Sequence, residues 1–295
     1  MKTRLLVLFG LLFCGAGLGY FLVTARRQSY PPTAAPIFEL IGRPIKTVDR
    51  TLTRVLPIDN LDEKELGDAI RLRYAAYKDQ HTSRGRYVQR LLEHISRNNR
   101  KGFTYTIYVL PQPYANAWAM PGGVLFITEG MLATIESEAE LVSILGHEMG
   151  HVELSHCMDG VRFQLLARKT GSRSLGELAD LAVGLLLRSS FSKNQESAAD
   201  RYGFDLLVVE NYDPAAAARV MQKLDDHQPV DETLDTKQIL SEYLMSHPYT
   251  NMRVARLESM AARYQGQRAY VGALNYKRRI TRQDREFPDD FNGID

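Results

Sequence analysis

The chain has 295 residues, of which 44% are hydrophobic and 24% charged, and its formal net charge is +2. This length supplies one sizeable domain or two small ones, and the composition is ordinary for a globular protein. Because the charge is near neutral and the basic residues are spread along the chain, no nucleic-acid partner is expected. The two cysteines, Cys14 and Cys157, are placed so that a disulfide between them is implausible.

The N-terminus has the pattern of an export signal. Lys2 and Arg4 precede an apolar run of about 21 residues, a length that can span a bilayer. The run is longer than the usual signal-peptide core of roughly 7–15 residues. We therefore interpret residues 1–25 as a signal peptide or a signal anchor, which leaves open whether the segment is cleaved or retained.

A linker and a helical region are predicted next. Residues 26–40 include a stretch rich in proline and small residues, which is typical of a linker. From residue 41 to about 100 the hydrophobic pattern is helical, with charges interspersed. Asp59 or Asn60 is the expected N-cap of the first charged helix in this region.

The hydrophobic pattern changes to period two after Gly102. Alternation over residues 103–109 predicts a half-buried strand. A second short strand, 115–120, runs into a Pro-Gly-Gly turn signal, and a third follows at 124–128. Residues 101–130 thus predict a β-hairpin with an edge strand. Helical periodicity then extends to about residue 265, and residues 266–295 form a polar tail without clear periodicity.

The helical region contains the pattern H-E-x-x-H, as His-Glu-Met-Gly-His. Ser137 and Glu140 predict a capping box at the start of its helix. Side chains four residues apart lie one turn above each other, so His147 and His151 point at one spot. Glu148 can reach a water on a metal held there without binding the metal itself. The pattern predicts a catalytic zinc site with Glu148 as the general base.

The alternative is a chance match, that is, a helix with solvent-facing histidines and a salt-bridging glutamate. The chain has seven histidines, which makes such a match rare at this composition. Two further histidines, His94 and His156, are interpreted as surface or capping residues.

A catalytic zinc needs three protein ligands and one open position. Downstream, Glu196 and Asp200 lie four residues apart at the start of a helical run. Such pairs are usually a solvated helix face, but beside an H-E-x-x-H helix Glu196 would complete a site with His147 and His151. Asp200 could accept a hydrogen bond from a ligand imidazole and fix its tautomer. One Zn²⁺ per chain is therefore expected.

At this point the sequence resembles a known family, the gluzincin metalloendopeptidases of the HtpX and CAAX-prenyl-endopeptidase group. The resemblance is especially to the secreted bacterial members of the YcaL, LoiP and BepA type. The matching segments, which lie within about half of the chain, are residues 116–132, 147–151, 192–200 and 246–253. Lys193 departs from the pattern, because many relatives carry arginine there.

The resemblance implies a mainly helical α+β fold, with a small antiparallel sheet beside the H-E-x-x-H helix of a zincin-type domain over residues 41–265. It implies that an extended peptide adds to an edge strand, a mode that binds many sequences through the main chain. It also implies that His247 and Arg253 line the cleft. The residues expected to bind substrate are Asn116, Ala117, Trp118 and Ala119.

The expected activity is hydrolysis of peptide bonds in unfolded or misassembled envelope proteins, on the periplasmic side of a bacterial cell. Glu148 would take a proton from water at the metal and pass it to the leaving amine. His247 or Arg253 would hold the oxyanion. Arg253 could instead form a structural ion pair, and His247 could instead occupy the open zinc position and hold the enzyme latent.

Two rival functions remain. A chaperone or assembly factor could keep the zinc fold and bind clients by edge-strand addition, although such a binder needs no base at position 148. An integral-membrane prenyl-protein peptidase would need several spans, and the other apolar run, 181–187, is far too short. That run is expected to pack in the core or to dip toward a membrane surface.

Overall fold

A computed structural model describes residues 59–77, 82–169, 174–187, 190–226, 243, 247–248 and 250–292. The chain divides into two units, Met1–Val55 and Leu56–Asp295, and all described residues belong to the second. The predicted export signal and linker lie outside the described residues. Within the described ranges, no helix combines the length and the apolar character needed to cross a membrane.

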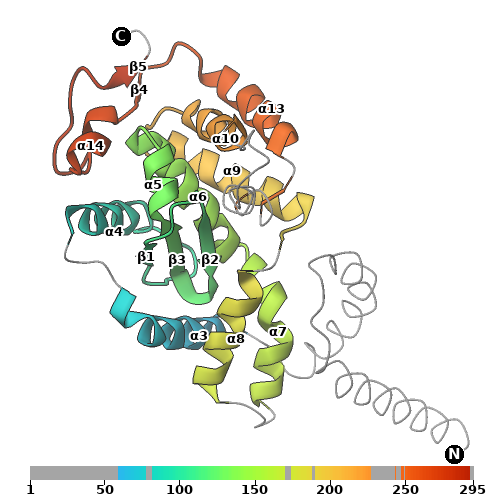
Figure 1. Cartoon of the computed structure of the whole chain (residues 1–295). Coiled ribbons are helices and arrows are strands. Elements are labelled where there is room, and N and C mark those ends of the chain that lie inside the picture. Colours follow the sequence, from blue (N-terminus) through green and yellow to red (C-terminus); the bar gives the residue numbers. More distant parts are fainter. Residues whose placement is uncertain are drawn as a thin grey trace, which may run out of the picture. The chain divides into compact units, whose positions relative to one another are not determined.

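Helices dominate the described part of the chain, which confirms the predicted fold class (Figure 1). The helices are α3 (Asn60–Arg73), α4 (Ser83–Ile95), α5 (Glu129–Thr134), α6 (Glu138–Glu153), α7 (His156–Lys169), α8 (Leu175–Leu186), α9 (Lys193–Val209), α10 (Ala216–Asp226), α13 (Thr250–Ala261) and α14 (Ala273–Arg278). The strands are β1 (Thr106–Leu110), β2 (Ala117–Met120), β3 (Val124–Thr128), β4 (Ala269–Tyr270) and β5 (Phe291–Asn292).

The main sheet has the order β1-β3-β2. β2 and β3 form the predicted antiparallel hairpin, but β1 runs parallel to β3, so the sheet is mixed rather than antiparallel throughout. The reason lies in the connection from β1 to β2, which crosses the end of β3. Gly130 N–H donates to the Gln112 carbonyl, and Thr128 N–H donates to the Asn116 carbonyl. A Cβ on Gly130 would lie 2.1 Å from the Pro113 oxygen, so only glycine permits this crossing.

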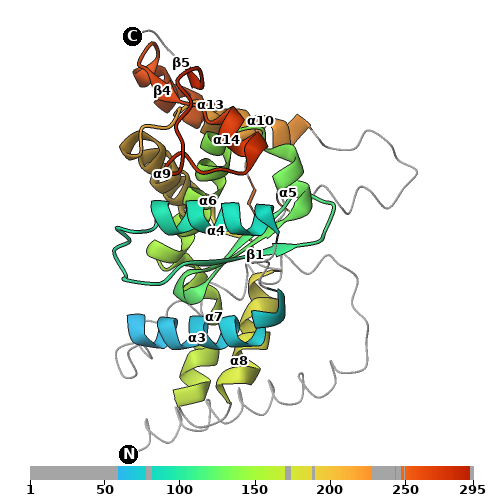
Figure 2. The same cartoon turned by 90° about the vertical axis from the view of Figure 1, so that its left-hand side faces the viewer.

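Helices cover both faces of this sheet. α4 and α6 pack on one face, and α3 and α8 pack on the other (Figures 1 and 2). The prediction of a half-buried first strand is therefore wrong: Thr106 and Tyr108, expected to face outward, are 5% and 1% exposed. Tyr108 stacks on Phe126 and donates to the Arg71 carbonyl of α3, which explains why this aromatic side chain is buried.

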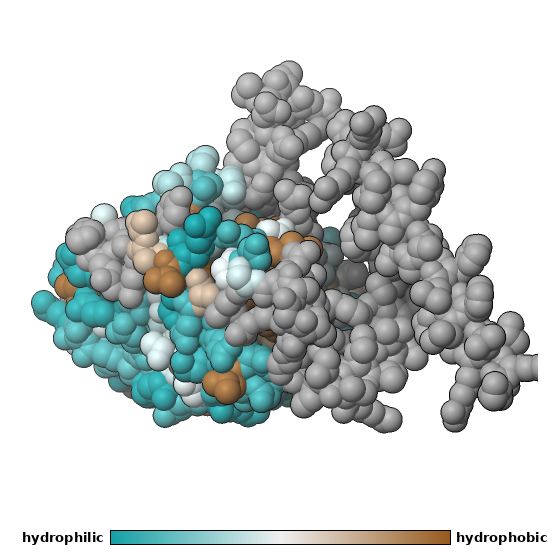
Figure 3. Space-filling model, turned by 90° about the horizontal axis from the view of Figure 1, so that it is seen from below, coloured by the Kyte–Doolittle hydropathy of each residue, from teal (hydrophilic) through white to brown (hydrophobic). Residues whose placement is uncertain are grey.

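The apolar run at residues 181–187 packs as core. It lies mostly in α8, which contacts α3 and α7. The side chains of Ala182, Val183 and Leu186 are buried there, while Leu187 at its end is 40% exposed. Figure 3 shows that the described residues on the face seen from below are mainly hydrophilic, with separate hydrophobic spots.

Side-chain caps fix the starts of α3 and α6, where the sequence predicted them. Asp59 caps α3 in a reciprocal capping box with Asp62, which confirms one of the two expected caps. Ser137 caps α6 and accepts from Glu140 N–H, as predicted. The other half of that predicted capping box is wrong, because the Glu140 carboxylate instead accepts from Glu136 N–H and from Lys223 Nζ.

The segment after residue 265, expected as a polar tail, folds onto the start of α6. β4 and β5 pair, and α14 lies between them in sequence. Glu138 N–H donates to the Gly272 carbonyl, and the buried Glu138 carboxylate accepts from Tyr87 and Tyr212 hydroxyls. Hydrogen bonds from hydroxyls and main-chain N–H groups make a buried carboxylate tolerable here.

α6 and α9 approach unusually closely along glycines. A Cβ on Gly146 would lie 2.9 Å from Gly203 Cα, and one on Gly150 would lie 2.9 Å from Ala199 Cα. Real Cβ atoms do not fit at such distances, so larger residues would push the helices apart. This contact places the H-E-x-x-H segment directly against the first half of α9.

We predict that Gly203→Ala destabilises the protein by about 1–3 kcal/mol, because the added methyl overpacks a closed helix contact. Its Cβ would lie 2.9 Å from His147 N. The matched control is Gly184→Ala in α8, where a Cβ meets nothing within 4 Å; helix propensity should make it neutral or stabilising by up to ~1 kcal/mol. Urea unfolding measures both, and a Gly203→Ala protein as stable as wild type would contradict the close packing.

Candidate metal centre

Two imidazoles from α6 converge on one point. His147 and His151 are 4% and 0% exposed, and their Nε2 atoms are 3.1 Å apart. The helical spacing thus brings the two rings together, with both Nε2 lone pairs aimed at the same place.

A carboxylate and a third imidazole complete the cluster. Glu196 lies in the first turn of α9, which Ser192 caps. Its oxygens lie 3.5 Å from His147 Nε2 and 3.5 Å from His151 Nε2. His247 Nδ1 lies 3.2 Å from both His147 Nε2 and Glu196 Oε1. Among the described residues, these four side chains form the group whose donor atoms all lie within 4.8 Å of one another.

The cluster has the dimensions of a tetrahedral metal site. Zinc bonds of about 2.0–2.1 Å in a tetrahedron place the donor atoms roughly 3.3 Å apart. Five of the separations within this cluster, given above, run from 3.1 to 3.5 Å, and all lie within 4.8 Å. Imidazole and carboxylate donors in this geometry suit zinc. The residues present therefore fit a zinc ion held by the chain.

A buried ion network surrounds the ligands. Asp200, one turn after Glu196, has Oδ1 3.0 Å from His147 Nδ1. Arg253 on α13, 4% exposed, donates to both oxygens of Asp200 at 3.0 and 2.7 Å. Its Nη1 lies 2.8 Å from Glu196 Oε2. One guanidinium thus compensates two carboxylates, that of Glu196 within the cluster and that of Asp200 beside it.

This network controls the protonation of its acids. Burial alone would raise the pKa of Asp200, but the Arg253 charge and the contact with His147 hold that pKa well below its usual range. Burial would likewise raise the pKa of Glu196, and the neighbouring His247 and His151 bring it far below normal. Both groups are therefore ionised, as a metal ligand and its support require.

Glu148 lies beside the cluster but is separated from it by His247. Its side chain is 0% exposed, and Oε1 is 3.5 Å from His247 Nε2. Neither carboxylate oxygen has a hydrogen-bond partner among the described residues. Burial lowers the pKa of His247, but the charges of Glu196 and Glu148 outweigh burial and raise it above its usual value. The imidazole of His247 thus takes the place where a water between Glu148 and the ligands would sit.

Three ring contacts were not found by sequence reasoning. Phe191 stacks on His151 at 3.7 Å between centroids, and Tyr243 stacks on His247 at 4.6 Å. His156, interpreted above as a surface or capping residue, lies with Nδ1 3.0 Å from His151 Nδ1, and burial lowers its pKa to about 4. That interpretation of His156 is wrong, because the turn after α6 folds it back onto the ligand. His94, in the last turn of α4, contacts the carboxylate of Glu210, in keeping with its interpretation as a surface or capping residue.

The predicted substrate strand, β2, is an edge strand of the described sheet. Its residues are nevertheless buried: Asn116, Ala117, Trp118 and Ala119 are 1%, 1%, 6% and 3% exposed. Antiparallel alternation turns the main-chain groups of Ala117 and Ala119 away from β3. Ala117 N–H donates to Asn116 Oδ1, and the Ala119 carbonyl accepts from the Cys157 thiol. The main-chain groups on the outer edge of β2 are thus partly hydrogen-bonded to other groups of the same chain.

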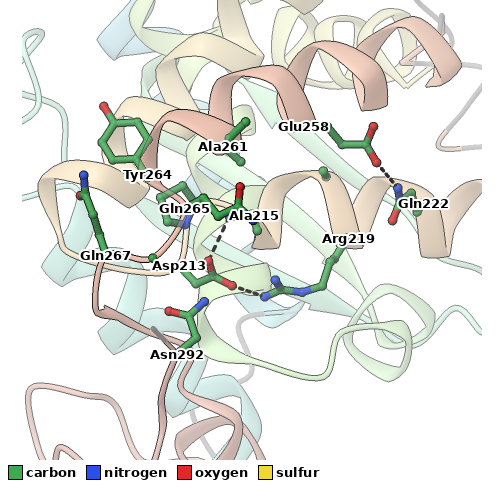
Figure 4. Close-up of a pocket in the computed structure, with 14 residues that line it drawn as sticks. Asp213, Ala215, Arg219, Gln222, Glu258, Ala261, Tyr264, Gln265, Gln267 and Asn292 are labelled. Carbon is green, nitrogen blue, oxygen red and sulfur yellow. Dashed lines mark hydrogen bonds and ion pairs between the residues drawn. The ribbon is translucent and has the colours of Figure 1, made fainter. Parts of the chain in front are cut away.

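The cavities near the cluster are small. The one that borders His147, Asp200, Tyr243 and Arg253 has about 10 Å³, room for roughly one water. A larger cavity of about 370 Å³ lies between α10, α13 and the C-terminal segment and shares no residue with the cluster (Figure 4). Polar groups there pair with one another, as Arg219 does with Asp213 and Gln222 does with Glu258 (Figure 4).

A mainly helical fold in which two histidines of an H-E-x-x-H helix meet a glutamate of a second helix in a buried cluster defines a zincin-type domain. The sequence matches the model of Peptidase family M48 over residues 79–261, more than half of the chain. The chain belongs to this family, which confirms the resemblance seen in its motifs.

Three relatives illustrate the match. The chain is 29% identical to the mitochondrial metalloendopeptidase OMA1 of Arabidopsis thaliana over 52% of this chain and 31% of that protein. It is 31% identical to the metalloprotease LoiP of Escherichia coli (strain K12) over 43% of this chain and 53% of that protein. It is 24% identical to the beta-barrel assembly-enhancing protease of Yersinia pestis over 53% of this chain and 34% of that protein. The chain thus spans about a third to a half of these relatives.

We predict that Asp200→Asn weakens zinc binding about 10–100-fold, because it removes the charged partner of His147 and leaves Arg253 undercompensated. Asp205→Asn is the matched control, since Asp205 lies on the same helix in an exposed pair with Arg201. Competition with a chromophoric chelator gives both dissociation constants. Equal affinity in the two variants would show that Asp200 does not support the ligand.

Proposed function

We propose that the protein is a zinc-dependent endopeptidase in which His147, His151 and Glu196 hold the metal and Glu148 is the general base. The observation that supports this most directly is the tetrahedral donor set beside a buried carboxylate that has no hydrogen-bond partner among the described residues. A buried carboxylate whose oxygens make no hydrogen bond is costly, so it is retained where it serves chemistry.

Each residue of the chain then has a defined task. When bound, zinc supplies Lewis acidity that polarises a peptide carbonyl and makes water nucleophilic near neutral pH. Glu148 accepts a proton from the attacking water and delivers it to the leaving amine. Asp200 holds the Nδ1 proton of His147, which leaves Nε2 free for the metal. Arg253 is assigned to the structural ion pair, because its guanidinium is already taken by Asp200 and Glu196.

In the proposed enzyme, His247 blocks the metal position that substrate and water would use, which makes this a closed form. Its Nδ1 sits at the fourth position of the donor set, and its Nε2 faces Glu148. A substrate carbonyl and a water both need that position, so His247 must leave before a peptide can be cleaved.

The proposed substrates are unfolded or loosely folded segments of proteins in a bacterial envelope. A peptide in extended form would pair with β2 through main-chain hydrogen bonds, with Asn116, Ala117, Trp118 and Ala119 as its platform. Pairing needs the outer edge of β2 to open, since Cys157 now bonds the Ala119 carbonyl. One relative carries a name that refers to β-barrel assembly, and a role in envelope quality control rests on that analogy. Membrane association would come from residues 1–25.

We predict that Glu148→Gln abolishes casein cleavage by the chain from Arg26 onward and leaves about one zinc per chain bound, because the amide cannot accept the proton but keeps the shape. A loss of at least ~100-fold in rate is expected, within the usual range for general-base catalysis. Cleavage and zinc content are measured on the same samples. If wild type and variant bind zinc alike and neither cleaves casein even after His247→Ala, a client-binding chaperone is the better function.

We also predict that His247→Ala raises casein cleavage, because it vacates the fourth position of the donor set. The gain should be roughly tenfold if the closed form outnumbers the open form by that ratio. His94→Ala is the control, since His94 pairs with Glu210 away from the cluster. A lower rate in His247→Ala would reject the closed form and favour a direct catalytic role for His247.

A further inference from the structure

We propose that His156 is a positioning residue for the metal ligand His151: its imidazole accepts the Nδ1 proton of His151 and thereby holds the ring with Nε2 toward the metal. This inference rests on the proposed zinc site, and it assigns a task to a residue outside the H-E-x-x-H pattern. The two Nδ1 atoms are 3.0 Å apart, which is hydrogen-bond distance.

The tautomer of His151 requires such an acceptor. A neutral imidazole that binds a metal through Nε2 carries its proton on Nδ1. His151 Nε2 faces His147 and Glu196, so its Nδ1 proton points away from the cluster. Because His151 is 0% exposed, water does not substitute readily for a protein acceptor. His156 Nδ1 is the acceptor within reach there, which places the proton of His156 on Nε2.

The whole ring of His151 is then fixed. Its Nε2 is part of the donor cluster, and its Nδ1 contacts His156. One face of the ring stacks on Phe191, with 3.7 Å between the ring centroids and an interplanar angle of 23°. The rings of His151 and His156 meet at 67°, so they contact through their edges, as a hydrogen bond between ring nitrogens requires, and not by stacking. His156 itself is not part of the four-residue donor cluster.

The chain fixes His156 by an unusual turn. Ser155 has φ of +62°, a left-handed conformation that is uncommon for serine, and it lets α7 begin at His156 directly after α6. Lys101 Nζ donates to Ser155 Oγ at 2.8 Å and to Glu63 Oε2 at 2.6 Å. This buried ion pair ties the turn to α3, so the position of His156 depends on an element far from the ligand helix.

The two ligand histidines are thus supported differently. His147 gives its Nδ1 proton to the charged carboxylate of Asp200, whereas His151 gives its proton to a neutral imidazole. A carboxylate partner raises the basicity of a ligand imidazole more than a neutral acceptor does. His151 should therefore be the weaker of the two donors, and its affinity for the metal should depend on how well its ring is oriented.

The test compares zinc affinity in full-length protein, measured by chelator competition, for His156→Phe and His156→Asn. Phenylalanine keeps a ring but offers no acceptor, so its zinc affinity should fall about 10–100-fold. Asparagine keeps an oxygen acceptor, so the zinc affinity of His156→Asn should stay within about threefold of the wild-type affinity. This change is small compared with the loss expected for His156→Phe. His94→Phe controls for the loss of a partly buried histidine and should bind as wild type does. If His156→Phe does not fold, His156→Leu replaces it.

The melting temperature of the metal-free proteins separates positioning from packing. The inference is supported if His156→Phe weakens zinc binding while its metal-free melting temperature matches that of His156→Asn. It is overturned if His156→Phe binds zinc as tightly as wild type, or if both variants weaken binding equally. Wild-type protein that binds no zinc would overturn the proposed function as well, so the two failures are distinguishable.

Discussion

The close contact between α6 and α9 is the constraint on which the rest of the structure depends. Gly146, Gly150 and Gly203 leave no room for side chains between the two backbones. Glu196 and Asp200 on α9 therefore reach the histidines of α6, although both carboxylate side chains are short. A wider helix pair, at the usual spacing of about 8–10 Å, would leave a gap that these side chains could not bridge. The glycines are thus part of the metal centre even though they donate nothing to it.

Charge compensation follows from that geometry. The contact buries the carboxylates of Glu148, Glu196 and Asp200 within one small region, where a single guanidinium, Arg253, neutralises part of the charge. Burying three acids against one such base is unfavourable unless further positive charge is present. A divalent cation held by the cluster would supply that charge, and its binding would then be coupled to the stability of the folded state. Arg253 is on α13, so the region after residue 250 is needed to complete the centre.

Residue spacing and turn signals in the sequence predicted the features that depend on local geometry. Helical spacing predicted that His147 and His151 share one face of a helix and that Glu196 and Asp200 share one face of another, and β3 was predicted because its turn signal is adjacent. That the two pairs meet depends on the contact between α6 and α9. The parallel pairing of β1 could not be predicted, since it depends on a crossing permitted by Gly130. The burial of Tyr108 and the contact of His156 with His151 likewise depend on which elements meet, and no spacing in the sequence encodes that.

In the proposed closed form, the position of His247 joins the geometry of the centre to control of its activity. A tetrahedral donor set of four protein side chains is typical of structural zinc, whereas catalytic zinc keeps one position open. The fourth donor here, His247, precedes α13, and its carbonyl accepts a hydrogen bond from Arg253 Nη1 at 3.2 Å. The arginine that compensates Asp200 and Glu196 therefore also contacts His247. In the proposed closed form, His247 would have to give up this contact before a peptide could be cleaved.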